Sequence, residues 1–162
     1  MSSMNLRQTP DRVEHHASIL DAAVEVAENS FFAFVDPVDV AGFEELTPGV
    51  PSWLEVSVGF DGAFAGTMRV VIAQPLALEL FTSFLGLEPG EPVDDPRLFD
   101  LVGELGNMVC GSWLTKTCRR RRFDLEPPSV SRLGASARPV ADALLLAMNG
   151  QPVWVRLEFA EP

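Results

Sequence analysis

Residues 53–73 read Trp-Leu-Glu-Val-Ser-Val-Gly-Phe-Asp-Gly-Ala-Phe-Ala-Gly-Thr-Met-Arg-Val-Val-Ile-Ala. In the first part, residues 53–60, apolar side chains fall at every second position, which is typical of a strand with one buried face. Asp61-Gly62 has the composition of a turn, and residues 65–73 then repeat the apolar alternation. The stretch therefore predicts a β-hairpin whose two strands share an apolar face.

Helical patterns and a second hairpin surround this first hairpin. The helical segments carry apolar residues at steps of three and four, and the later strands meet at Asn149-Gly150, a strong type I′ turn signal. The expected elements are helices over residues 11–34, 75–85 and 95–118 and strands over residues 143–148 and 152–159.

This order of elements indicates the fold class. Helices that bracket two antiparallel strand pairs predict an α+β domain, with an antiparallel sheet built from hairpins and helices packed on one face, including the long helix 95–118. Residues 36–51, which hold three prolines and two glycines, are expected to form a connecting loop. Because no second linker interrupts the chain, residues 1–162 are expected to form a single domain, with residues 1–10 as a flexible N-terminus.

The composition limits the classes of partner. A formal net charge of −11 and a sequence pI near 4.5 disfavour nucleic acid and anionic lipid as partners. We interpret the isolated basic run Arg119–Arg122 as a solvated helix end rather than a nucleic-acid site. No apolar run approaches the ~20 residues of a membrane span, and the N-terminal part lacks a signal-peptide pattern. A cytoplasmic protein without membrane contact is therefore expected.

The cysteines and histidines give no sign of a metal site. Cys110 and Cys118 lie eight residues apart on one expected helix, a rise of ~12 Å, whereas a disulfide tolerates a Cα separation of ~7 Å. We therefore expect both to be packing residues. His15 and His16 are expected at the surface, and without a Cys/His cluster of ligand spacing no metal site is predicted.

The long helix carries an unusual combination of polar residues and glycines. Asp100, Glu104 and Asn107 follow one another at steps of four and three, so their side chains line one face. Gly103 and Gly106 lie inside the helix, where each costs ~1 kcal/mol relative to alanine. Glycine is retained in mid-helix where another backbone or a partner must come close. The segment therefore predicts a polar stripe beside glycine gaps, a shape suited to docking against another protein.

The chemistry of this stripe is limited by its side chains. The amide of Asn107 cannot act as a general base, but it can accept one hydrogen bond from a water molecule and donate another, which fixes the water for attack. Amide side chains that orient water serve phosphoryl transfer in this way. Glu104 can act as a base or pair with a cation on a partner, and the residues alone do not decide between these roles.

The motif resembles that of a known family. Asp100-x-x-x-Glu104-x-x-Asn107, followed about twenty residues later by Pro127 or Pro128, is similar to the signature of the CheC/CheX/FliY chemotaxis phosphatases. The resemblance extends over residues 11–160 and includes three further stretches, Asn107-Met-Val-Cys-Gly111, Glu126-Pro-Pro-Ser-Val130 and the strand, turn, strand and helix of residues 56–86.

The resemblance implies an activity and a role for each motif residue. Members of the family hydrolyse the aspartyl phosphate of CheY-type response regulators. Asn107 would orient the attacking water, and Glu104 would pair with the active-site lysine of the regulator. Asp100, with Gly103 and Gly106, would support docking. The chain would need no metal or cofactor of its own, because the Mg²⁺ belongs to the partner regulator's active site.

The first helix favours one branch of this family. CheC-like members carry two motifs, whereas CheX-like members carry one per subunit and form homodimers. Residues 21–28 repeat the spacing of the motif, but Glu28 stands where asparagine is required, and Asn29 follows one position late. A single functional helix therefore favours a CheX-like phosphatase that acts as a homodimer.

Two alternatives to catalysis remain open at the level of the sequence. The first is a non-catalytic module that binds a receiver domain or scaffolds a two-component pathway. The second is a nucleotide-binding regulator that uses Arg119–Arg122, although the chain has neither of the glycine-rich phosphate loops typical of such sites.

Overall fold

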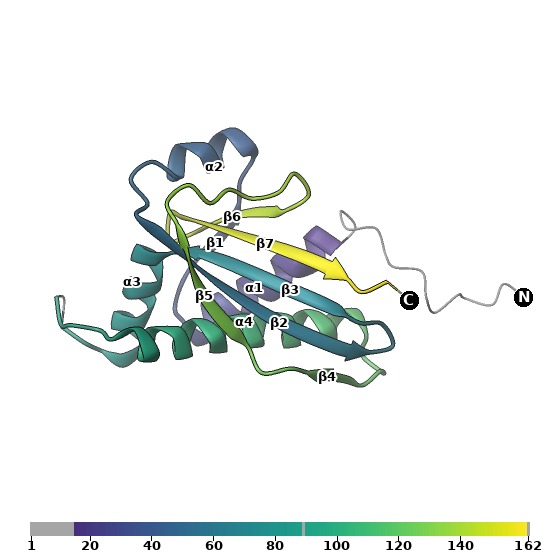
Figure 1. Ribbon diagram of the computed structural model, residues 1–162. Coiled ribbons are helices and arrows are strands. Elements are labelled where there is room, and N and C mark those ends of the chain that lie inside the picture. The colour runs from purple at the N-terminus through teal and green to yellow at the C-terminus, as the bar shows by residue number, and fades with distance from the viewer. Residues whose placement is uncertain (1–14, 89, 162) are drawn as a thin grey trace, which may run out of the picture.

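The computed structural model describes residues 15–88 and 90–161, and within them it contains four helices and seven strands (Figure 1). The expected flexible segment 1–10 lies outside the described residues. The elements are α1 (His16–Ser30), β1 (Val35–Pro37), α2 (Val40–Leu46), β2 (Ser52–Gly62), β3 (Gly66–Ala73), α3 (Gln74–Leu85), α4 (Asp95–Thr117), β4 (Phe123–Leu125), β5 (Ser129–Gly134), β6 (Leu144–Met148) and β7 (Gln151–Phe159).

The strands of the described chain form one antiparallel sheet. Its order is β1-β6-β7-β3-β2, and both β4 and β5 pair with the outer side of β2. Figure 1 shows the face of the sheet opposite the long helix α4, which lies behind the strands. The predicted α+β architecture, with an antiparallel sheet built on hairpins and a long motif-bearing helix, is confirmed.

Both predicted hairpins are present, but one turn differs from the prediction. Asn149 and Gly150 have φ angles of 49° and 75°, as a type I′ turn requires. Asp61-Gly62 is not a turn, because β2 continues through Gly62 and pairs there with β4. The chain reverses over residues 63–65 instead. The prediction was wrong here because a short partner strand from later in the sequence extends β2.

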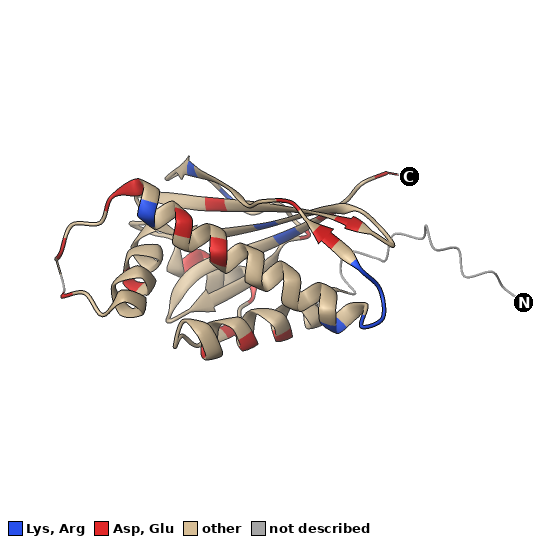
Figure 2. Ribbon diagram, turned by 90° about the horizontal axis from the view of Figure 1, so that it is seen from below, with Lys and Arg blue, Asp and Glu red and all other residues tan. Residues whose placement is uncertain are grey.

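Helices α1, α3 and α4 pack against the same face of the sheet. Figure 2 shows α1 and α4 side by side beneath the strands. The inward face of β2 presents Leu54, Val56 and Val58 to these helices, and all three are fully buried. Trp113 of α4 is also fully buried. The main core therefore lies between the sheet and the helix that carries the polar stripe.

The segment predicted as a loop, residues 36–51, contains structure. Its start belongs to β1, which pairs with β6, and α2 follows with Asp39 as its N-cap. Phe43 of α2 stacks on Trp53 at 6.4 Å and meets Trp154 edge-on at 6.1 Å, on the sheet face opposite α4. The loop prediction was wrong because tertiary contacts of one aromatic side chain hold a helix of only seven residues.

The first helix is shorter than predicted. It ends at Ser30 rather than near residue 34, because Phe32 takes a left-handed φ of 52° and turns the chain toward β1. The amide of Ala33 then donates a hydrogen bond of 2.9 Å to the carbonyl of Ala27. Residues 11–14, the start of the predicted helix, lie outside the described chain.

The N-terminus of α4 is fixed by two adjacent aspartates with different partners. Asp94 is the N-cap, and its carboxylate accepts a hydrogen bond of 2.9 Å from the amide of Arg97. Asp95 instead accepts two hydrogen bonds of 2.9 Å from the guanidinium of Arg132 on β5. These hydrogen bonds lower the pKa of Asp95. The bidentate pair ties the start of α4 to the edge of the sheet.

The prediction that both histidines lie at the surface was wrong for His15. This residue is buried, with ring contacts of 5.4 Å to Trp113 and 5.6 Å to Phe159. His16 is half-buried, and its Nε2 lies 3.0 Å from the carbonyl oxygen of Asp142. The histidines therefore help to seal the end of the core, a role that only the tertiary structure reveals.

The two cysteines are free, as expected from their spacing. Cys110 is buried, and burial raises the pKa of its thiol to about 12. Cys118 is only partly buried, and burial raises its pKa as well. None of the helices in residues 15–88 and 90–161 has the length and apolarity that a membrane span requires.

We expect a thiol reagent to distinguish these cysteines in the native protein. The thiolate is the reactive form, so at pH 8 Cys118 should react with Ellman's reagent first, and Cys110 only after unfolding in guanidinium chloride. The Cys118→Ser variant should then show no fast thiol. Reaction of Cys110 in that variant as fast as in the unfolded chain would contradict the buried position.

Candidate functional site

The polar stripe lies on the outer face of α4. Asp100 and Glu104 are exposed and Asn107 is half-buried, so the structure brings these three residues together on one face. Figure 2 shows acidic residues along this side of α4. In residues 15–88 and 90–161, Glu104 and Asn107 have no hydrogen-bond or ion-pair partner. Both functional groups are therefore available to another molecule.

The glycines of the motif face the sheet. A Cβ atom on Gly106 would lie 2.5 and 2.7 Å from the two Cγ atoms of Val56 on β2. A Cβ atom on Gly103 would lie 3.3 Å from Cγ of Pro128. Gly106 thus forms no gap beside the polar stripe, which corrects the expected shape. Both glycines allow α4 to approach its own sheet, and their expected part in partner docking stays a prediction.

Pro128 is the motif proline that meets the helix. It follows the short strand β4, and its ring faces Gly103, with Cγ 3.3 Å from where a Cβ on that glycine would lie. The chain bends between β4 and β5 next to Gly59, whose carbonyl accepts a hydrogen bond of 2.8 Å from the amide of Glu126. The position of Pro128, about twenty residues after Asn107, therefore places the proline ring between α4 and the edge of the sheet.

Two hollows flank the carboxylates of Asp100 and Glu104. The first, of about 680 Å³, lies toward α1 and α3. The second, of about 470 Å³, lies toward β5 and includes Pro128 and Val130. Asp100 and Glu104 line both hollows and form a ridge between them. A partner that covers this ridge must also cover at least one hollow.

The walls of the larger hollow were not predicted from the sequence. They include Phe84 and Leu85, the last two residues before the C-cap Gly86, with exposed fractions of 51% and 44%. The only signal in the sequence was a pair of apolar residues directly before the glycine that ends a helix. Because three separate helices form the hollow, helical periodicity could not reveal it.

The acidic stripe of α1 differs from that of α4. Asp21, Glu25 and Glu28 are exposed, but Glu25 Oε2 lies 2.6 Å from Nζ of Lys116 on α4. This exposed ion pair involves Glu25, the residue that corresponds to Glu104 in the repeated spacing. Asp21, Glu25 and Glu28 therefore form a surface stripe in which the central carboxylate already has a partner.

Charge is distributed unevenly along α4. Arg119–Arg122 are exposed directly beyond its C-terminus and form the basic loop in Figure 2, whereas the acidic residues gather toward its N-terminus. In the part of the chain that the structure describes, no group of three histidine, cysteine or acidic residues is placed to hold a metal ion. The chemistry available at α4 is thus that of carboxylates, one amide and apolar hollows.

Solved structures share this arrangement of elements. CheX of Vibrio vulnificus matches with a TM-score of 0.70 and 19% identity, over 94% of this chain and 100% of that chain. CheX of Borrelia burgdorferi, solved as a CheX–CheY–BeF3–Mg complex, matches with a TM-score of 0.61 and 18% identity, over 92% and 99%. FliY of Thermotoga maritima matches with a TM-score of 0.57 and 16% identity, over 94% and 91%. This chain therefore shares the fold of these proteins.

The family follows from the sequence. The model of the family "Chemotaxis phosphatase CheX" matches residues 55–141, more than half of the chain, and this chain belongs to that family. The matched region includes most of β2 and all of β3, α3 and α4, and with them the complete polar stripe. A comparison with curated proteins finds no match.

Proposed function

We propose that this chain hydrolyses the aspartyl phosphate of a CheY-type receiver domain. The observation that carries the proposal is the pair Glu104 and Asn107, which lie one turn apart on the outer face of α4 with no partner among the described residues. The chain belongs to a phosphatase family, and this pair lies within the region that the family model matches. A fixed helix that presents an amide beside a carboxylate suits a reaction that depends on positioning.

In the proposed reaction, Asn107 enters the receiver's active site and orients one water molecule. Its amide oxygen accepts a hydrogen bond from the water, and its NH₂ group donates one to a phosphoryl oxygen. The water oxygen bonds to phosphorus while the bond between phosphorus and the aspartate oxygen breaks, which yields inorganic phosphate and a free carboxylate. The water proton leaves with the phosphate or to solvent.

Glu104 and Asp100 bind rather than react in this proposal. The carboxylate of Glu104 pairs with the lysine of the receiver's active site, and Asp100 supports docking one turn earlier on the same face. This chain supplies no metal, because Mg²⁺ held by the receiver neutralises the phosphoryl charge. Because the site is a single helix face, a homodimer, which stays a prediction, would present two such faces.

The test is the decay of a phosphorylated receiver in the presence of Mg²⁺, with and without the protein. We expect the wild-type chain to accelerate the decay. In Glu104→Ala the receiver concentration for half-maximal rate should rise about tenfold, since one charge-assisted contact is lost. Glu45→Ala, which removes an exposed acid of α2 on the opposite face of the sheet, is the control and should match the wild type.

The same assay distinguishes catalysis from simple binding. A chain that binds the phosphorylated receiver without accelerating its decay would be a receiver-binding or scaffolding module, and the proposed phosphatase activity would be wrong. Equal kinetic curves for Glu104→Ala and the wild type would show that catalysis does not use this carboxylate.

A further inference from the structure

The hollow between α1, α3 and α4 is an apolar pocket that borders the proposed site. Its volume is about 680 Å³, and Asp100 and Glu104 form part of its rim. Phe84 and Leu85 line it and remain substantially exposed, at 51% and 44%. Apolar side chains gathered in an open hollow of this kind mark a surface that binds a partner. The other apolar residues of the lining are Phe31, Phe81, Leu101 and Met108.

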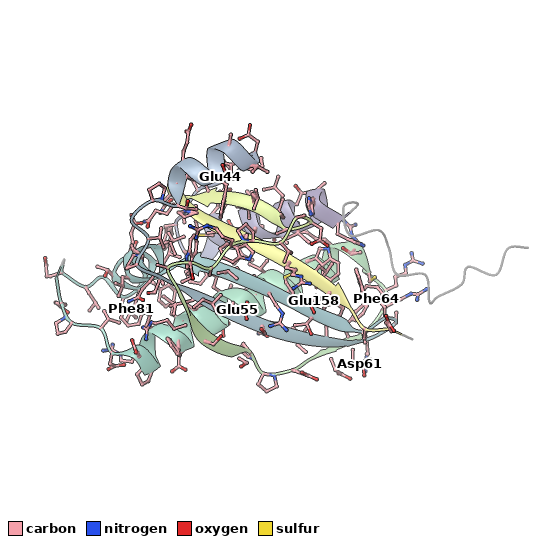
Figure 3. The ribbon with its side chains drawn as sticks, turned by 45° about the horizontal axis from the view of Figure 1, so that its top comes forward. Glu44, Glu55, Asp61, Phe64, Phe81 and Glu158 are labelled. Atoms are coloured by element: carbon pink, nitrogen blue, oxygen red, sulfur yellow. The ribbon has the colours of Figure 1, made fainter. Side chains whose placement is uncertain are left out.

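The surroundings of the pocket indicate the charge of the partner. The carboxylates of Asp100 and Glu104 lie at its edge, and α1, which packs beside α4, exposes Asp21, Glu25 and Glu28. Figure 2 shows the acidic residues of both helices on the same side of the molecule. The guanidinium of Arg97, also in the lining, lies over the Phe81 ring at 5.4 Å. Phe81, labelled in Figure 3, belongs to α3.

This charge distribution favours a partner with basic residues around an apolar projection. A second copy of the chain would bring like charges together on this face, which opposes association. A receiver that offers its active-site lysine to Glu104 has the required charge at the required place. Glu104 lines the pocket as well as the proposed site, so a receiver seated on Glu104 lies over the pocket opening.

We propose that this pocket takes an apolar side chain from the receiver surface next to its active-site lysine. The inference rests on the proposed function, which supplies the receiver as the partner. The pocket contributes affinity and choice of receiver, and Asn107 contributes turnover. Substitutions in the pocket should therefore weaken receiver binding and leave the rate of the bound complex unchanged.

The experiment measures binding separately from catalysis. CheY-type receivers from the same genome, loaded with beryllofluoride and Mg²⁺, are titrated with the protein by calorimetry. Leu85→Asp places a charge in the pocket and should weaken binding about tenfold or more. Val140→Asp is the matched control, because Val140 is 40% exposed near α2, away from this pocket, and binding should stay within about twofold.

A second variant distinguishes loss of the pocket contact from misfolding. Phe84→Ala removes one pocket wall without adding charge and should weaken binding in the same direction, while thermal melting monitored by circular dichroism checks that each variant is folded. Folded Leu85→Asp and Phe84→Ala proteins that bind like the wild type would overturn the pocket proposal, even where wild-type catalysis is present. Binding that depends on the pocket but brings no dephosphorylation would contradict the phosphatase proposal and support the pocket proposal. Failure of the wild type to bind any of these receivers would overturn both.

Discussion

Replacing Asn107 by alanine should slow receiver dephosphorylation on the order of 100-fold, because a water molecule without an orienting amide rarely lies in line with the phosphorus atom. Asn107 is half-buried on the outer face of α4, and its side chain has no hydrogen-bond partner among the described residues. The loss should therefore appear mainly in kcat. The affinity for a receiver loaded with beryllofluoride should fall by much less than kcat.

Two further variants make this prediction specific. Asn107→Asp keeps the shape of the side chain but removes its donor and adds a negative charge beside the phosphoryl group, so its activity should be as low as that of the alanine variant. Thr115→Ala changes an exposed residue on the same helix, about 12 Å along its axis, and should retain wild-type activity. Full activity of Asn107→Asp would contradict the water-orienting role.

Replacing Gly106 by alanine should destabilise the fold by about 1–3 kcal/mol, because overpacking a close contact costs that much. The added Cβ would lie 2.5 Å from a Cγ atom of Val56, a fully buried residue of the central sheet. The Tm of a domain of this size should fall by about 2–4 °C per kcal/mol. Urea unfolding followed by tryptophan fluorescence gives the free energy directly.

The chain offers a matched control on the same helix. Gly111→Ala places a Cβ 3.7 Å from the nearest atom, on Leu125, which is ordinary contact. This variant should gain up to ~1 kcal/mol from helix propensity. A Val56→Ala change in the Gly106→Ala background should recover part of the loss, because it removes the clashing methyl groups. Equal stability of the two glycine variants would show that α4 does not need its close approach to β2.

The elements with a strong sequence period were predictable, and those held by tertiary contacts were not. The two hairpins follow from apolar alternation, and α4 from an apolar stripe of more than five turns. The short helix α2 depends on Phe43 packing against Trp53 and Trp154, which lie on strands far apart in the sequence. Proline and glycine dominate the local signal there, so the segment resembles a loop.

The candidate site, too, was predictable where it depends on one helix and not where it depends on tertiary contacts. Asp100, Glu104 and Asn107 share one helix, so their common face could be predicted from spacing alone. The direction in which the glycines point could not, because it depends on which side of α4 meets the sheet. The apolar pocket was also beyond prediction, because its walls come from three helices and become adjacent only in the folded chain.

The order of the strands in the sheet has a consequence for the synthesis of the protein. β1 pairs with β6, and the edge of β3 that faces away from β2 is covered by β7, the last of the described strands. The ribosome therefore releases α1, β1, the first hairpin and α4 before the strand that completes the sheet. Until then β3 presents unpaired backbone groups that can template association with another chain. We expect chains that stop before β7 to aggregate, and α4 to reach its final position only after β7 has emerged.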